Sequence, residues 1–239
     1  MSAVLVRVDD GVMQITINRP DKLNAFNTEV RGGMISALTE AAASDDVRVI
    51  VIGGNGRAFS AGADVQEIRN RDHTGIDVDG EFYRLFRLVH ESPKPVIARW
   101  HGYVAGAALQ ISLLCDLRIA AENARIGMTE VNLGMPVLIG SALLSAVVGD
   151  GAMRRLILYA DFVDGTEAHR MGLATEVHSE DFLEARIDEV ARRLVSRNPE
   201  ALRVTRLGWT EDTRGWFDHM FDQAQRLRVR LTPELPRNA

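Results

Sequence analysis

Two short stretches of small residues could use the backbone itself for chemistry. They are Ala58–Asp64 (Ala-Phe-Ser-Ala-Gly-Ala-Asp) and His101–Ala107 (His-Gly-Tyr-Val-Ala-Gly-Ala), and each follows a β-branched apolar run, Val47–Ile52 or Val96–Ala98. Small side chains let a ligand approach the peptide N–H groups closely. Two such loops at the ends of two strands can present two donors to one oxygen. The pattern predicts an oxyanion hole in an enzyme that acts on an activated carbonyl, although each loop alone also fits a tight strand-to-helix turn.

Two polar side chains could work beside these N–H groups. If a helix begins near Gly106, the N–H of Ala107 lies in its first turn, unpaired and at the positive end of the dipole. Gln110 projects from the same helix face, where it can hydrogen-bond but cannot transfer a proton at neutral pH. Glu130 stands among apolar and small residues, and burial there would raise its pKa and strengthen it as a general base. The alternatives are a merely structural Gln110 on a buried helix and an exposed loop glutamate at position 130.

Other polar residues near these loops are interpreted as structural. Asp64 is expected to cap a short helix over residues 64–69. Asp116 is expected to serve as a partner for backbone or arginine at the start of a strand, and His101 has no defined role. Cys115 lies in an apolar run and reads as a buried, inert thiol rather than a nucleophile.

Composition narrows the class of protein. The chain has 239 residues, of which 46% are hydrophobic and 26% charged, with a net charge of −5, and this balance argues against nucleic acid as a partner. One cysteine and six histidines without ligand spacing predict no disulfide framework and no metal site. No apolar run reaches membrane-spanning length and the N-terminus lacks a signal-peptide pattern, so we expect a cytoplasmic protein with no membrane partner.

Periodicity predicts the elements that must position these groups. A hairpin is expected over residues 5–17, and later strands at 47–52, 95–100, 116–121 and 174–178. Helices are expected from residue 27 onward and over residues 80–91 and 106–114, where Phe82, Tyr83 and Phe86 suit a core or the wall of an acyl pocket. After residue 140 the chain is mostly helical, with helices at 141–148, 152–159, 166–171 and 181–197 and a last one reaching Arg228. This order predicts one α/β core with a helical C-terminal part, and a frayed tail over residues 231–236.

The motifs together resemble one family. Asn18-Arg19-Pro20 followed by Asn24–Asn27, then Ala58–Asp64, then Gly102–Asp116 and Glu130–Gly134, resemble the crotonase (enoyl-CoA hydratase/isomerase) superfamily in order and spacing. The similarity extends over residues 5–210. It implies an α/β spiral of repeated strand-strand-helix units, with a core at 1–195 and a helical oligomerisation region at 196–239.

The resemblance also implies roles for the loop residues. Ala61 and Ala107 would supply the two oxyanion-hole N–H groups that hold the carbonyl of a coenzyme A thioester. The CoA moiety would lie along Lys22, Leu23 and Ala25 on one side. On the other side it would meet residues of the two small-residue loops, namely Ala61, Gly62, Ala63, Asp64, Val65, Gly106 and Ala107. No cofactor is implied beyond the CoA of the substrate, and a homotrimer or hexamer is expected.

Gln110 departs from the family pattern. Enoyl-CoA hydratases of this family usually carry a glutamate there and a second one at the position of Glu130, and the pair shares water activation and proton delivery. A single glutamate suffices to shift a double bond from 3-enoyl-CoA to 2-enoyl-CoA, so isomerisation by Glu130 is the leading expectation. The alternatives are hydration assisted by Gln110, a non-catalytic acyl-CoA-binding protein, and a hydrolase or decarboxylase that uses another residue.

Overall fold

A six-stranded sheet is the framework of the molecule. The computed structural model describes residues 2–70 and 80–228, and its main sheet has the strand order β1-β2-β3-β5-β7-β9. Its strands are β1 (Val4–Asp9), β2 (Val12–Ile17), β3 (Val49–Gly54), β5 (Val96–Trp100), β7 (Leu117–Ala121) and β9 (Glu176–His178). The hairpin β1–β2 is antiparallel and every other pairing is parallel. The predicted hairpin and the four predicted strands are therefore confirmed.

Three strands that the sequence does not reveal form a second sheet. β4 (Ala58–Ser60), β6 (Tyr103–Ala105) and β8 (Arg125–Gly127) pair in parallel in the order β4-β6-β8. Each has only three residues, too few for a periodic signal, and two of them lie within the stretches read as loops. The expected strand-strand-helix units are thus present. β4 and β6 carry the chain into the two small-residue turns, and β8 carries it toward Glu130.

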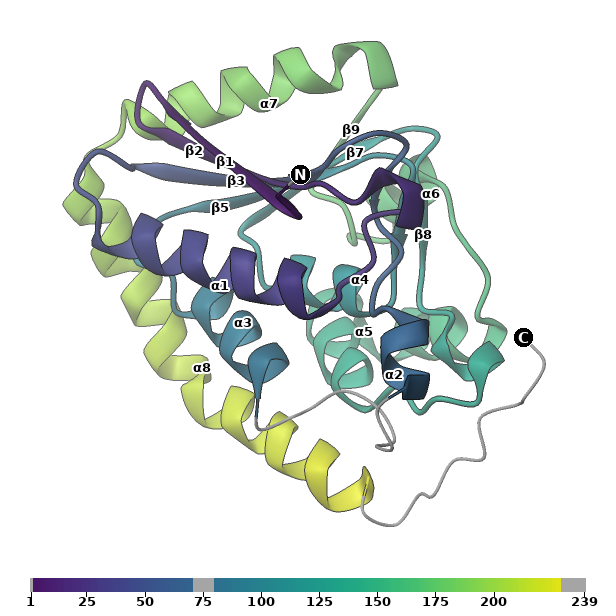
Figure 1. The fold of residues 1–239 in the computed structure, drawn as a ribbon. Coiled ribbons are helices and arrows are strands. Elements are labelled where there is room, and N and C mark those ends of the chain that lie inside the picture. Colours follow the sequence, from purple (N-terminus) through teal and green to yellow (C-terminus); the bar gives the residue numbers. More distant parts are fainter. Residues whose placement is uncertain (1, 71–79, 229–239) are drawn as a thin grey trace.

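Helices cover both faces of the main sheet (Figure 1). α7 (Glu180–Val195) lies on one face, and α1 (Thr28–Ala43), α3 (Glu81–His90) and α4 (Ala107–Ser112) lie on the other. The remaining helices are α2 (Val65–Asn70), α5 (Leu138–Tyr159), α6 (Gly165–Arg170) and α8 (Pro199–Arg228), with short 3-10 turns η1 (Pro20–Lys22) and η2 (Glu130–Leu133). α1 begins where predicted because the side chain of Asn27 accepts from the N–H of Val30 at 3.0 Å.

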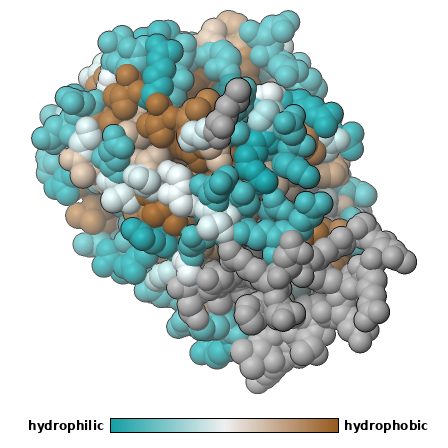
Figure 2. Space-filling model, in the orientation of Figure 1, coloured by the Kyte–Doolittle hydropathy of each residue, from teal (hydrophilic) through white to brown (hydrophobic). Residues whose placement is uncertain are grey.

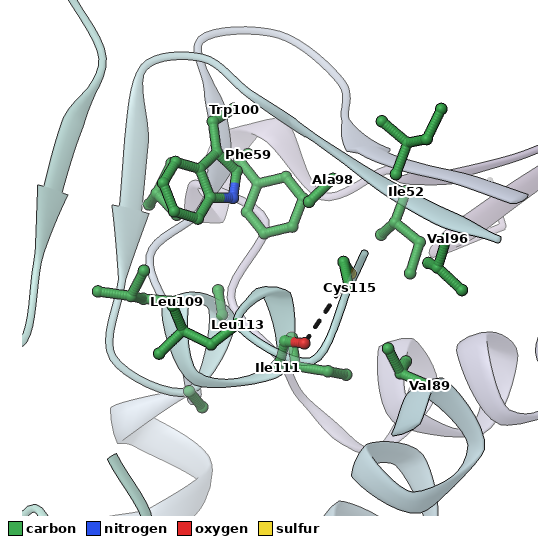
Figure 3. Close-up of a cluster of buried hydrophobic side chains, with 14 of the residues drawn as sticks. Ile52, Phe59, Val89, Val96, Ala98, Trp100, Leu109, Ile111, Leu113 and Cys115 are labelled. Carbon is green, nitrogen blue, oxygen red and sulfur yellow. Dashed lines mark hydrogen bonds between the residues drawn. The ribbon is translucent and has the colours of Figure 1, made fainter. Parts of the chain in front are cut away.

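The apolar core continues beneath α4. Figure 3 shows Phe59 of β4, Trp100 of β5 and Leu109 of α4 within one cluster of buried side chains; all three are fully buried. Cys115 is also buried there, and its thiol lies 3.9 Å from the carbonyl of Ile111. A short helix packed on this core holds its N-terminus in one place, which a site built from backbone N–H groups requires.

The C-terminal helices differ in detail from the prediction. α5 joins the two helices expected at 141–148 and 152–159 across a kink at Gly149, whose φ of +76° interrupts the helix. α8 packs onto its own chain: Phe217, Met220 and Phe221 belong to the main core. Arg206 on α8 donates to Asp116 and to the carbonyl of Ser92. The expected frayed tail at 231–236 lies outside the described residues.

Hydrophobic and hydrophilic residues are unevenly distributed over the surface. Figure 2 shows that most of the face seen in Figure 1 is hydrophilic, with hydrophobic residues gathered in its upper part. The edge strand β1 leaves Leu5, Val6 and Val8 each 45% exposed. Within residues 2–70 and 80–228, the structure contains no helix that combines the length and apolarity needed to cross a membrane.

Candidate functional site

The N-terminus of α4 offers a free backbone donor. Gly106 caps the helix with φ +53° and ψ −127°, a conformation that only glycine adopts without strain. Ala107 follows as the first helical residue, so its N–H has no partner within the helix, and no other described residue accepts from it. A Cβ atom at Gly106 would lie 3.3 Å from Oε1 of Glu130. The Glu130 carboxyl therefore lies next to the turn that carries the free N–H.

The second donor comes from Ala63 rather than Ala61. The N–H of Ala61 donates to the carbonyl of Leu23 at 2.9 Å, so the expectation that Ala61 supplies an oxyanion donor is wrong. Ala63 forms a parallel bridge with Phe26. The hydrogen bonds of this bridge involve the two neighbours of Ala63: the N–H of Phe26 donates to the carbonyl of Gly62, and the N–H of Asp64 donates to the carbonyl of Phe26. In the described part of the chain, nothing accepts from the N–H of Ala63.

The two donor loops touch each other. A Cβ atom at Gly62 would lie 3.2 Å from the nitrogen of Ala107 and 2.7 Å from the carbonyl oxygen of Ala105. Gly62 has φ +92°, so the close approach and the backbone conformation both require glycine. The free N–H groups of Ala63 and Ala107 thus belong to adjacent turns, as an oxyanion hole needs.

Glu130 and Gln110 form a pair beside these donors. Nε2 of Gln110 donates to Oε1 of Glu130 at 2.8 Å. Oε2 of Glu130 and Oε1 of Gln110 are shielded from solvent and have no hydrogen-bond partner. Burial raises the pKa of Glu130, while a backbone hydrogen bond and the one from Gln110 lower it in part. Glu130 therefore has a buried carboxyl with one oxygen hydrogen-bonded to Gln110 and one without a partner, an arrangement that suits a general base.

The residues expected to bind CoA surround this pair of loops. Lys22 is exposed at the end of η1, and Leu23 follows in the left-handed region with φ +47°. The carbonyl of Ala25 accepts from Nη1 of Arg19 at 2.6 Å. Asp64 caps α2, because its Oδ1 accepts from the N–H groups of Gln66 and Glu67, and Val65 is the first residue of that helix. Their contact with a ligand stays a prediction.

The other polar candidates are structural. His101 is buried, and its Nε2 lies 3.0 Å from the carbonyl of Gly56. Asp116 accepts from the N–H of Val96 at 2.7 Å and from Arg206, as its sequence position predicts. Cys115 is buried as expected, and burial raises the pKa of its thiol to about 12, which disfavours the reactive thiolate. Across residues 2–70 and 80–228, the structure brings no three His, Cys, Asp or Glu side chains together as a possible metal site.

Arg19 makes a contact that the sequence does not predict. It lies in Asn18-Arg19-Pro20, which indicates only a turn, yet its guanidinium reaches Asp64 forty-five positions further along the chain. The free N–H of Ala63 was also missed as a donor, because a sequence shows neither which backbone groups are paired nor which are free.

The sequence is similar to those of known proteins. A profile of the enoyl-CoA hydratase/isomerase family matches residues 7–227. The chain is 32% identical to a short-chain-enoyl-CoA hydratase of Clostridium acetobutylicum over 86% of this chain and 80% of that protein. It is 33% identical to the 1,2-epoxyphenylacetyl-CoA isomerase of Escherichia coli over 82% of this chain and 78% of that protein.

Solved structures agree with this likeness. The crystal structure of an enoyl-CoA hydratase from Mycobacterium avium subsp. paratuberculosis K-10 superposes with a TM-score of 0.84 at 34% identity. The match covers 93% of this chain and 90% of that one. Fold and sequence therefore agree, and the chain is an enzyme that belongs to the enoyl-CoA hydratase/isomerase family.

Proposed function

We propose that the protein shifts the double bond of a 3-enoyl-CoA to give the conjugated 2-enoyl-CoA. The observation that carries this proposal is the pairing of one buried carboxyl, Glu130, with an amide that cannot titrate, Gln110, at 2.8 Å. Among the described residues no second carboxyl contacts Glu130. One proton-transfer group is enough for isomerisation, because the proton that leaves one carbon returns to another.

The proposed reaction uses the free oxygen of Glu130. Oε2 removes a proton from C2 of the 3-enoyl thioester, and the electron pair of that C–H bond moves onto the thioester oxygen as a dienolate. The N–H groups of Ala63 and Ala107 stabilise this oxygen, each by about 3 to 4 kcal/mol in the transition state. Protonated Glu130 then delivers the proton to C4, the double bond forms between C2 and C3, and the carboxylate is regenerated. Gln110 keeps Oε1 in place during both transfers.

Matched substrates test the proposal. The purified protein is incubated with a trans-3-enoyl-CoA and, separately, with the trans-2-enoyl-CoA of the same chain length. Conjugated 2-enoyl thioester from the first, with little water added to the second, supports isomerisation. If neither substrate is converted and an acyl-CoA binds tightly, the proposed isomerisation is wrong and a non-catalytic acyl-CoA-binding function takes its place.

Hydration of a 2-enoyl-CoA is the second candidate. Two buried acceptors, Oε2 of Glu130 and Oε1 of Gln110, have no partner, and a water molecule could donate to both. Several relatives with 31–34% identity are named hydratases. In this case Glu130 performs all proton transfer while Gln110 orients the water. Efficient hydration of the 2-enoyl substrate would establish this reaction, and Gln110→Glu should then increase it by adding a second acid.

We also infer that CoA lies along η1 and the first turn of α2, with Lys22 and Asp64 at its borders, and that the chain assembles as a trimer or a dimer of trimers. Light scattering with size-exclusion chromatography tests the assembly. Protection of the Lys22 amine from acetylation by bound acyl-CoA tests the first inference, since an equal acetylation rate with and without ligand would exclude that contact.

A further inference from the structure

Arg19 joins the two backbone segments that meet beside the candidate oxyanion hole. Its Nη1 donates to the carbonyl of Ala25 at 2.6 Å and to Oδ2 of Asp64 at 3.0 Å. The side chains of Arg19 and Asp64 are only 20% and 13% exposed. A charge-assisted contact shielded from water to this degree is stronger and better defined than one between exposed side chains.

The segment that this contact stabilises is anchored by other bonds just before Ala63. The N–H of Ala61 donates to the carbonyl of Leu23, and the Ser60 hydroxyl donates to the carbonyl of Asn24 and accepts from the N–H of Gly62. Ala63 lies in an isolated bridge with Phe26, made by the N–H of Phe26 on Gly62 at 2.7 Å and the N–H of Asp64 on Phe26 at 3.2 Å. At Ala63 itself, these two hydrogen bonds fix little more than one peptide unit on each side. Arg19 contacts Ala25, which precedes Phe26, and Asp64, which follows Ala63. It therefore connects the two segments on either side of the bridge. The N–H of Ala63 points away from this bridge.

Arg19 is itself attached to a rigid base. Its backbone N–H donates to Oδ1 of Asn24 at 2.8 Å, and the Asn24 side chain is fully buried. Nδ2 of Asn24 donates to the carbonyls of Asn55 and Ala58, next to the strand that leads into the Ala63 turn. Arg19 and Asn24 therefore connect the position of Ala63 to β4 of the second sheet.

The two carboxylate oxygens of Asp64 accept hydrogen bonds from different groups. Oδ1 accepts from the first N–H groups of α2, while Oδ2 accepts from Arg19. Loss of the guanidinium would leave Asp64 free to rotate toward the helix. The peptide that carries the N–H of Ala63 is only one residue away, so its direction would follow.

We propose that Arg19 is a positioning residue that sets the direction of the Ala63 N–H and so completes one half of the oxyanion hole. This inference rests on the oxyanion hole of the proposed function, but not on which reaction follows enolate formation. Arg19 acts through Ala25 and Asp64 and does not touch the reacting atoms. Its removal should weaken stabilisation of an enolate oxygen far more than binding of the thioester, because a misplacement of about 1 Å can reduce a rate about 100-fold.

Acetoacetyl-CoA provides a readout that is independent of turnover. Its enolate has a distinct ultraviolet absorbance, so the fraction bound as enolate reports the strength of the oxyanion hole. In Arg19→Met we expect this fraction to fall about tenfold and kcat to fall about 10- to 100-fold. The Kd of saturated butyryl-CoA should stay within about threefold. Arg19→Lys keeps the charge and should restore part of the enolate signal.

Arg48→Met is the matched control. Arg48 also donates to two backbone carbonyls, those of Val195 and Arg197, and these lie at the end of α7. Its loss should lower stability without changing the enolate signal. If Arg19→Met does not fold, Arg19→Gln takes its place, because a shorter, neutral amide cannot make the charge-assisted contact with Asp64.

The outcomes separate this inference from the choice of reaction. A wild-type enolate signal that is lost in Arg19→Met supports the inference even if no isomerisation is found. Arg19→Met with the wild-type enolate fraction and kcat would overturn it, as would an equal loss of kcat and of butyryl-CoA affinity. A wild-type protein that gives no enolate signal would remove the oxyanion hole itself and this inference with it.

Discussion

Nε2 of Gln110 and Oε1 of Glu130 lie 2.8 Å apart, although α4 and η2 bring them from positions twenty residues apart in the chain. This contact makes the two oxygens of one carboxylate unequal. Oε1 is held by a neutral amide, and Oε2 is buried without a partner. An amide in this place orients the base without competing for its proton, which is the physical basis of the single-base reaction proposed here.

Replacing the base should abolish turnover and leave ligand binding intact. Glu130→Gln keeps the size and the hydrogen-bonding capacity of the side chain but cannot remove a proton. We expect kcat to fall at least about 1000-fold, because a general base contributes up to about 10⁴. Isothermal titration with butyryl-CoA should give a nearly unchanged Kd. Glu200→Gln, at an exposed glutamate on α8, is the control with normal activity, and full activity of Glu130→Gln would exclude Glu130 as the base.

The pH dependence of the reaction should report the burial of Glu130. Only the ionised carboxyl is a base, so kcat/KM should fall as the pH drops through the pKa of Glu130, and burial places this limb above the usual range of glutamate. Gln110→Met removes a hydrogen bond that lowers this pKa, so the limb should move to higher pH. A pH–rate profile of each protein checks the prediction, and a shift to lower pH in the variant would contradict it.

The Ala107 donor can be removed with little change in the fold. Proline is tolerated at the first position of a helix because the missing N–H has no helical partner there, and Ala107 is the first residue of α4. Ala107→Pro should lower kcat about 100- to 1000-fold, with circular dichroism and Tm close to those of the wild type. Ala107→Ser, which keeps the N–H, is the control. Equal activity of the proline and serine variants would show that this N–H does not contact the reacting oxygen.

The docking of α8 should depend on one buried ion pair. The side chain of Arg206 is 6% exposed and that of Asp116 is 20% exposed, with Nε and Oδ2 3.1 Å apart. Arg206→Met leaves a largely buried carboxylate with only Arg118 as a nearby cation, and it should lower the free energy of unfolding by up to about 3 kcal/mol, measured by urea denaturation. Asp116→Asn in the same chain should recover part of this loss, since it removes the charge that Arg206 no longer neutralises. A double variant less stable than Arg206→Met would contradict this explanation.

Cys115 should react only when the protein unfolds. Burial raises the pKa of its thiol to about 12, and the thiolate is the reactive form. Iodoacetamide at pH 8 should leave the native protein unmodified, and the labelling rate should rise with urea in parallel with unfolding. Cys115→Ala should retain activity. Rapid labelling of the folded protein would show that the thiol is accessible.

Hydrophobic patterning was sufficient for most of the framework. A β-branched run such as residues 47–52 is typical of a strand buried on both faces, and the capping residue Asn27 marks the start of α1. These signals are local, and they are sufficient to predict the main sheet and the large helices. The strands β4, β6 and β8 did not, because three residues that pair only with distant segments carry no period of their own.

The sequence by itself determined the chemical groups of the site: two small-residue loops, one carboxyl at Glu130 and one amide at Gln110. Only the tertiary structure decided which backbone donors are free. The N–H of Ala61 is engaged by Leu23 and that of Ala63 is not, although both stand in the same loop. The reason is physical: a partner nearly forty residues earlier in the chain decides whether a backbone N–H is satisfied, and no local pattern records that contact.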